Sequence, residues 1–136
     1  MDTFRSVEEA RKYYKDDHFW MAAGIRIETL EGGHCVCSME IKDDLHRNAL
    51  GGVMGGALFT LADAAFSAAS NNIHHPTVGL SGSISFLSAA KGKILTATAD
   101  CVKDGGTTCV YEVRIKDDTG RDVALFTGTG FKLKRE

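Results

Sequence analysis

The sequence predicts an α+β fold in which an antiparallel sheet curls around one long apolar helix. Residues 55–71 carry the most apolar helical pattern in the chain, stretches with period-two alternation lie on both sides of it, and turn residues separate those stretches. The chain has 136 residues, of which 43% are hydrophobic and 25% charged, so we expect one domain spanning residues 1–136. A parallel α/β fold would need more helices.

A short helix is expected near the start of the chain, because Ser6 and Glu9 have the spacing of a capping box and good helix formers follow as far as Lys15. Alternating residues between Gly24 and Glu40 surround Gly32-Gly33, which predicts two strands joined by a tight turn. The aromatic residues between these elements are expected to cover one end of the sheet: Tyr13, Tyr14, Phe19 and Trp20.

The long helix is expected from Gly55 to about Asn71, with Leu58, Leu61 and Ala65 among its apolar positions. Phenylalanines and alanines fill most of the remaining circumference, so burial almost all round is expected. Four further alternating stretches predict connected antiparallel strands, at 77–87, 93–103, 107–116 and 121–132.

Charge and cysteine content exclude several classes of protein. The formal net charge is −2, and basic residues form no stripe, which disfavours a nucleic-acid partner. There is no signal-peptide pattern and no apolar stretch of about 18 residues, so we expect no membrane segment and a cytoplasmic location. The cysteines lack C-x-x-C or zinc-site spacing, so buried free thiols are expected rather than disulfides or a metal site: Cys35, Cys37, Cys101 and Cys109.

Asp63 is the only residue with a formal charge between Arg47 and Lys91, and it lies in the middle of the apolar helix. Burying a carboxylate is costly unless it is hydrogen-bonded, paired or used in chemistry. One interpretation is a structural aspartate bonded to a nearby hydroxyl. The other is a nucleophile or general base whose pKa is tuned by apolar surroundings.

Helical spacing places Asp63 in a polar line with Gly56, Thr60, Ser67 and Ser70, which predicts a polar crevice along the helix. Gly55 and Gly56 at the helix start leave main-chain N–H groups free to hold an oxyanion. Asp63 lies eight residues beyond Gly55, about 12 Å along the axis, so both cannot act on one carbonyl within one chain. We therefore expect a homodimer in which two such helices pack antiparallel and share two sites.

The segment from His46 to Phe66 resembles the H-x-N-x-x-G-x-x-H-G-G-x-x-x-x-L-x-D-x-A signature of hotdog-fold thioesterases of the phenylacetate-degradation (PaaI) type. Weaker similarity extends over roughly residues 22–132. The resemblance implies a hotdog fold, a dimer often paired into a tetramer, and hydrolysis of acyl-CoA thioesters. It implies no cofactor, because CoA is part of the substrate.

By matching position, the resemblance makes Asp63 the carboxylate that attacks the thioester or activates water. The Gly55 N–H would hold the thioester oxygen, and Asn48 would orient the substrate or the water. His46 and Gly56 also match the signature and are expected near the substrate. In the family, the aspartate comes from one subunit, and the asparagine and glycine come from its partner.

Two positions depart from the family pattern. Met54 replaces the usual histidine and cannot donate a proton, although it could shape an acyl pocket. Gly79 stands where related enzymes place a hydroxyl, so Ser81 or Ser83, expected on the same face of the strand, are candidate substitutes.

These residues suggest three functions. The preferred one is an acyl-CoA thioesterase acting on an aromatic or medium-chain acyl group. The alternative is a module that binds acyl-CoA or a small aromatic acid without turnover, with Met54 marking the lost chemistry. A hydratase is disfavoured, because the loop before the helix lacks a paired aspartate and histidine.

Overall fold

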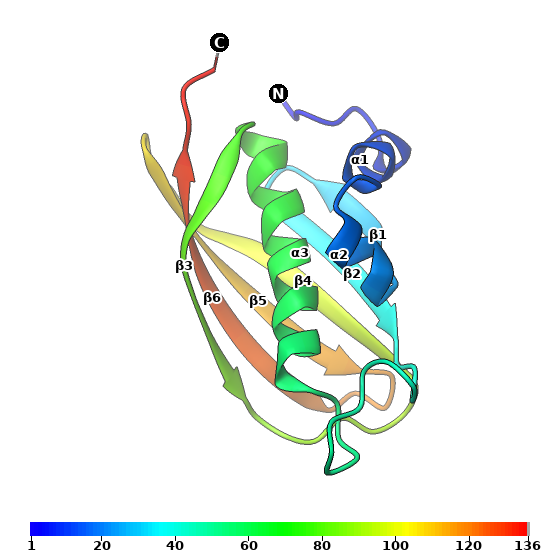
Figure 1. Cartoon of the computed structure of the whole chain (residues 1–136). Helices are drawn as coiled ribbons and strands as arrows, with labels where there is room; N and C mark the ends of the chain where they lie inside the picture. Colours follow the sequence, from blue (N-terminus) through cyan, green and yellow to red (C-terminus); the bar gives the residue numbers. More distant parts are fainter. Residues whose placement is uncertain (136) are drawn as a thin grey trace.

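A computed structural model, which describes residues 1–135, shows a six-stranded antiparallel sheet wrapped around one long helix (Figure 1). The helices are α1 (Val7–Tyr14), α2 (His18–Ala23) and α3 (Gly55–Ile73). The strands are β1 (Ile25–Glu31), β2 (His34–Glu40), β3 (Thr77–Phe86), β4 (Ile94–Asp104), β5 (Thr108–Asp117) and β6 (Asp122–Lys132). The expected α+β architecture is confirmed, and Glu136, the last residue of the expected domain, lies outside the described residues.

Strand order in the sheet is β1-β2-β4-β5-β6-β3, with every neighbouring pair antiparallel. The β1–β2 hairpin and the β4–β5–β6 series agree with the predicted strands. The sequence led us to expect that β3 would pair with β4, the next strand in the chain, but it does not. Instead, β3 pairs with β6 at one edge of the sheet, and β4 pairs with β2. Residues 87–93 make a long connection between β3 and β4 rather than a tight turn. As a result, β1 and β3 are the two edge strands.

One side of α3 packs on the concave face of the sheet, where Leu61, Ala65 and Ala69 are fully buried. Phe66 packs against the rings of Tyr111 and Phe126 at centroid distances of 5.6 and 6.0 Å. The expectation that α3 is buried almost all round is wrong for the single chain. The sheet covers only one side of the helix, so Gly56, Phe59 and Asp63 reach the surface.

The N-terminal segment forms two helices where one was expected. At the start of α1, the Ser6 hydroxyl accepts a hydrogen bond from the Glu9 N–H at 3.1 Å, as the capping box predicts. The unpredicted α2 begins after Asp17, whose carboxylate accepts from the Trp20 N–H at 3.4 Å. It ends at Gly24, whose φ of 81° suits glycine far better than other residues.

The aromatic cover predicted for this region is only partly correct. Tyr14 and Trp20 are buried and stacked, with ring centroids 4.4 Å apart. Tyr13 and Phe19 remain exposed. The Trp20 indole N–H also donates to the Ile25 carbonyl at 3.2 Å, which ties α2 to the start of β1.

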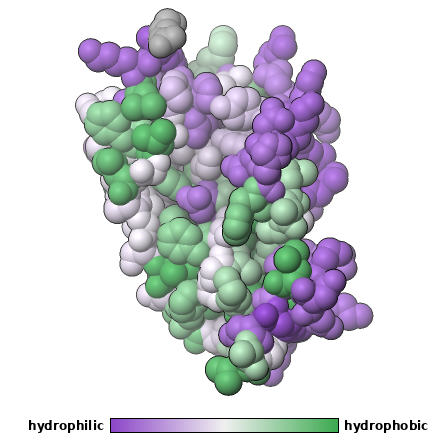
Figure 2. Space-filling view, viewed as in Figure 1, coloured by the Kyte–Doolittle hydropathy of each residue, from purple (hydrophilic) through white to green (hydrophobic). Residues whose placement is uncertain are grey.

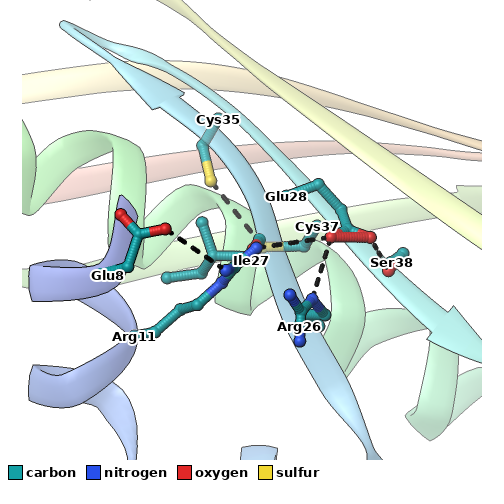
Figure 3. A network of polar contacts seen from close by, with 8 residues as sticks. All are labelled: Glu8, Arg11, Arg26, Ile27, Glu28, Cys35, Cys37 and Ser38. Carbon is teal, nitrogen blue, oxygen red and sulfur yellow. Dashed lines mark hydrogen bonds and ion pairs between the residues drawn. The ribbon is translucent and has the colours of Figure 1, made fainter. Parts of the chain in front are cut away.

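A polar network fixes α1 along the edge strand β1 (Figure 3). Arg11 donates from Nε to the Ile27 carbonyl at 2.8 Å and lies 3.6 Å from Glu28. Glu28 also accepts from Arg26 at 3.1 Å and from the Ser38 hydroxyl at 2.9 Å. The network therefore joins α1, β1 and β2.

All four cysteines are free thiols, as predicted. Cys35 and Cys37 lie side by side in the core with their sulfur atoms 3.7 Å apart, and Cys101 is only half-buried. Within residues 1–135, no helix has the length and apolarity needed to span a membrane.

Asp117 holds the β5–β6 turn to the chain segment that leads into β4. Burial alone would raise the pKa of this carboxyl, but hydrogen bonds from the Thr119 hydroxyl and the N–H groups of Lys91, Arg121 and Thr119 outweigh burial and lower the pKa to about 2. A carboxyl with a lowered native pKa stabilises the fold above its ordinary pKa. That contribution is lost as the pH falls through the native value.

We predict that Asp117→Ala lowers the urea midpoint of unfolding near neutral pH. The difference from wild type should shrink between about pH 4 and about pH 2, where the wild-type carboxylate takes up its proton. Asp122→Ala is the control, because Asp122 is exposed and its side chain makes, within residues 1–135, only a long ion pair with Lys116 at 3.7 Å. Equal midpoints for the two variants would contradict the role assigned to Asp117.

Candidate active site

Asp63 lies in the third turn of α3 and lines a pocket of about 270 Å³ between α3 and α2. Asp17, Phe19 and Trp20 form the α2 side of this pocket. Protein atoms around the carboxyl raise the pKa of Asp63 by desolvation, and the negative charge of Asp17 raises it further. The outer edge of the side chain still reaches solvent in the single chain.

A purely structural role for Asp63 finds little support in its surroundings. Among residues 1–135, no group forms a hydrogen bond with the Asp63 carboxyl. The neighbouring hydroxyls are used elsewhere, since Thr60 donates to the Gly56 carbonyl at 2.7 Å and Ser67 lies 3.2 Å from the Tyr14 hydroxyl. Asp63 is therefore a carboxylate with free oxygen atoms beside a pocket, which suits a nucleophile or a base.

The predicted polar line along α3 is shorter than expected. Gly56, Thr60 and Asp63 form its accessible part, while Ser67 is half-buried. Ser70 is only 3% exposed and donates to the Ser67 carbonyl at 3.3 Å, so it does not line the pocket. The helix end beyond Ser67 is covered by the first residues of the chain and by α1, which periodicity alone does not indicate.

The start of α3 provides free main-chain donors. Met54 precedes the helix, and its carbonyl accepts from the N–H groups of Ala57 and Leu58 at 3.0 and 3.3 Å. The N–H groups of Gly55 and Gly56 have no acceptor within the described part of the chain. A Cβ on Gly55 would lie 2.8 Å from the Phe86 ring, so only glycine lets this helix end approach β3 so closely. Donors of this kind suit an oxyanion.

Asn48 is held rigidly in the loop before α3. Its Oδ1 accepts from the N–H groups of Leu50 and Gly52 at 3.0 and 3.1 Å, and its own N–H donates to the Gly52 carbonyl at 2.8 Å. These hydrogen bonds orient the side-chain amide so that Oδ1 faces the N–H groups of the loop. The Nδ2 group then has no acceptor among residues 1–135. Asn48 thus presents a fixed donor next to the helix start.

His46 is buried and makes two hydrogen bonds through its ring. Nδ1 accepts from the Lys42 N–H at 2.9 Å, so the proton is on Nε2, which donates to the Ala23 carbonyl at 2.9 Å. Both ring nitrogens are therefore engaged with the main chain. In this arrangement His46 braces the loop against the end of α2.

The single chain keeps the two groups of candidate residues apart. Asn48 and Gly55 line a pocket of about 390 Å³ together with Phe86 and the residues that follow β3. Asp63 lines a different pocket, about 12 Å further along the helix axis. No pocket of the described chain contains both groups, as the helical spacing requires.

The expectation that Ser81 and Ser83 lie near the substrate is not supported by their orientation. A bulge at Leu80 shifts the register, so Gly79 pairs with Gly130 while Ser81 pairs with the adjacent Thr129. Gly82 faces α3, where an added Cβ would lie 3.1 Å from the Phe59 ring. Ser81 and Ser83 flank Gly82 and therefore point to the opposite face of the sheet, unlike Gly79.

Sequence reasoning missed the contribution of α2 to this site. Asp17, Phe19 and Trp20 line the Asp63 pocket, yet no helix was expected there. The signal was present in Asp17 and Gly24, which are suitable residues for the two ends of a short helix. Within residues 1–135, no cluster of three or more His, Cys, Asp or Glu side chains is arranged to hold a metal ion.

Comparisons with known proteins agree with this fold. Residues 50–124 match the family described as the thioesterase superfamily. The chain is 33% identical over 130 residues to the acyl-coenzyme A thioesterase PaaI of Escherichia coli, covering 95% of this chain and 92% of that protein. It is 30% identical to the 1,4-dihydroxy-2-naphthoyl-CoA hydrolase of Listeria monocytogenes, covering 83% of this chain and 94% of that protein.

Solved structures show the same relationship. The E. coli PaaI structure superimposes with a TM-score of 0.86 at 32% identity and covers 92% of this chain and 91% of that chain. The structure of a hypothetical thioesterase with coenzyme A from Streptococcus pneumoniae has a TM-score of 0.81 at 34% identity, and the match covers 90% of this chain and 98% of that chain.

The chain therefore belongs to the thioesterase superfamily, and its fold is the hotdog fold. Its resemblance to the PaaI-type thioesterases is confirmed, and its enzyme class is thioester hydrolase.

The raised pKa of Asp63 predicts an effect on stability. Above its native pKa the carboxyl is charged in both states, and the native state bears the cost of desolvation and of the nearby Asp17. We expect Asp63→Asn to raise the urea midpoint near pH 7. The gain should shrink as the pH falls and both native and unfolded wild type take up the proton. Asp16→Asn, at an exposed position, is the control; a midpoint for Asp63→Asn no higher than this control would contradict the prediction.

Proposed function

We propose that this protein hydrolyses acyl-CoA thioesters at two sites shared between the subunits of a homodimer. The observation that carries the proposal is the separation of Asp63 from Asn48 and Gly55 along one rigid helix. Each chain holds a complete set of chemical groups but places them in two pockets. An antiparallel partner helix brings the start of one α3 beside Asp63 of the other.

In the proposed reaction, the thioester oxygen accepts a hydrogen bond from the Gly55 N–H, and the positive end of the helix dipole stabilises the negative charge that develops on it. Asp63 acts in one of two ways. As a general base it removes a proton from water, whose oxygen bonds to the carbonyl carbon. As a nucleophile it forms a mixed anhydride that water then hydrolyses. In both, the carbon–sulfur bond breaks, the sulfur leaves as a thiolate that takes up a proton, and the acyl group leaves as a carboxylic acid.

Asn48 fits the task of orienting the substrate or the water, because its Oδ1 is fixed and its Nδ2 is available. Met54 cannot supply a proton to the departing sulfur. A thiolate is a good leaving group and needs little such help, so the remaining groups are sufficient for turnover. The proposed reaction uses no metal ion and no cofactor beyond the CoA of the substrate.

The surface around β3 supports a homodimer. β3 is an edge strand ten residues long, paired only with β6 within the described chain. Val78, Leu80 and Phe86 are 45–59% exposed along it. Figure 2 shows apolar side chains gathered over β3 and the start of α3, whereas charged side chains dominate the side of α1. A long apolar edge of this kind normally needs a partner.

The first test is thiol release from acyl-CoAs by the wild type and by Asp63→Ala. We expect the substitution to lower turnover by orders of magnitude because it removes the proposed nucleophile or base, while circular dichroism shows the fold unchanged. Asp16→Ala is the matched control at an exposed aspartate. A turnover rate of Asp63→Ala equal to that of the wild type would contradict the role of Asp63 as nucleophile or base.

A binding module is the second candidate, because Met54 replaces a proton donor of the family pattern. Tight binding of several acyl-CoAs by the wild type, with no thiol released from any of them, would favour the binding module over the enzyme.

Mixed dimers test the shared site directly. Asp63→Ala and Asn48→Ala homodimers should each be nearly inactive. A dimer with one chain of each kind keeps one site in which the intact Asp63 faces the intact Asn48. Random reassortment makes about half of the dimers mixed, so about a quarter of wild-type activity should return. A mixture no more active than its components, with mixed dimers confirmed by native mass spectrometry, would contradict a shared site.

A further inference from the structure

We infer that the acyl group of the substrate binds in an apolar cavity between α2 and the first turns of α3, and that the α2 wall determines which acyl groups are accepted. This inference rests on the proposed thioesterase function. The cavity has a volume of about 450 Å³. Its wall comes from α2, the loop before α3, and α3 itself: Phe19, Ala22, Ala23, Leu45, His46, Met54, Gly56, Ala57, Phe59 and Thr60.

Within the described part of the chain, the wall offers no free polar side chain to a ligand. No Asp, Glu, Lys or Arg side chain lines it, and its only polar side chains are His46 and Thr60. Both nitrogens of His46 are engaged with the main chain, and the Thr60 hydroxyl donates to the Gly56 carbonyl. A polar substituent on a bound acyl group would lose its water without gaining a partner. The cavity therefore suits a hydrocarbon group, aromatic or aliphatic, and rejects a charged one.

The cavity adjoins the pocket of the proposed nucleophile or base. Phe19, Phe59 and Thr60 line both the apolar cavity and the pocket of Asp63. Phe59 and Asp63 are one helical turn apart on α3. An acyl chain in the cavity can therefore extend its carbonyl toward Asp63 while the rest of the CoA thioester leaves in the direction of the partner subunit.

Two exposed apolar side chains, Phe19 and Met54, line the cavity. Phe19 is 75% exposed and Met54 is 50% exposed, although both are large and apolar. Met54 lies over Gly56, where an added Cβ would be 2.5 Å from its terminal methyl group. Covering both side chains with a bound hydrocarbon removes apolar surface from water, which favours binding. Met54, which replaces the usual histidine of the family, would therefore contribute to substrate binding.

Ala22 provides the sharpest test, because it lies on the wall and its side chain is exposed, so a larger residue fits without disturbing the core. We expect Ala22→Leu to fill part of the cavity and to lower kcat/KM for phenylacetyl-CoA by about tenfold or more. The same variant should leave kcat/KM for acetyl-CoA within about twofold of wild type, because a methyl group does not reach the cavity. Met21→Leu is the matched control, since Met21 lies on α2 but lines a different pocket beside Arg11 and Arg26.

A binding measurement separates failure of this inference from failure of the proposed function. The probe is a thioether analogue of phenylacetyl-CoA, which lacks the carbonyl and cannot be hydrolysed, compared with S-methyl-CoA. Calorimetry should show that Ala22→Leu lowers the affinity for the phenyl probe by about tenfold and leaves the affinity for the methyl probe unchanged. That result supports the inference even if the wild type releases no thiol. Equal affinity of wild type and Ala22→Leu for the phenyl probe, or equal losses for both probes, would overturn it.

Discussion

The apolar side of α3 lies against the concave face of the sheet, where Leu61, Ala65 and Ala69 are completely buried. Small alanine side chains let the helix approach the strands closely, and Phe66 fills the space toward β5 and β6. This contact orients the rest of the molecule. Once that side is buried, Gly56 and Asp63 are directed to the surface, α2 can lie over the outer part of the helix, and the helix start points at the loop that carries Asn48.

A helix is rigid, so it fixes the distance between groups along its axis. In this protein, α3 carries both the N–H groups and the carboxylate of the proposed reaction. Its first N–H groups and its Asp63 side chain are kept about 12 Å apart by helix geometry, whatever the rest of the chain does. Flexibility within one chain cannot join them. The desolvated carboxyl and the free N–H groups at the helix start each fit a reaction at a carbonyl, and in the proposed function each meets its complement on a second chain. Dimerisation would therefore be part of the proposed chemistry itself.

Much of the fold was predictable because it follows from local patterns. Period-two stretches indicated all six strands. The helical spacing of apolar residues indicated α3 and showed Asp63 as the one charged residue within that pattern. The errors came from features that such patterns do not encode. The partner of β3 depends on how a long connection crosses the molecule, and one extra residue at Leu80 turned Ser81 and Ser83 to the other face. For α2, six residues were too few to show a period, although Asp17 and Gly24 marked its ends.

The two edges of the sheet are not equivalent. Along β1, α1 lies beside the strand and Arg11 occupies the Ile27 carbonyl, so a further strand would have to displace a charged side chain and its carboxylate partners. Along β3 the apolar edge is open. When two copies join at that edge, the joined sheet has a blocked edge at each end and no third copy can add to it. In the proposed dimer, the polar network around Arg11 would therefore stop growth of the sheet at two chains and protect against fibre formation.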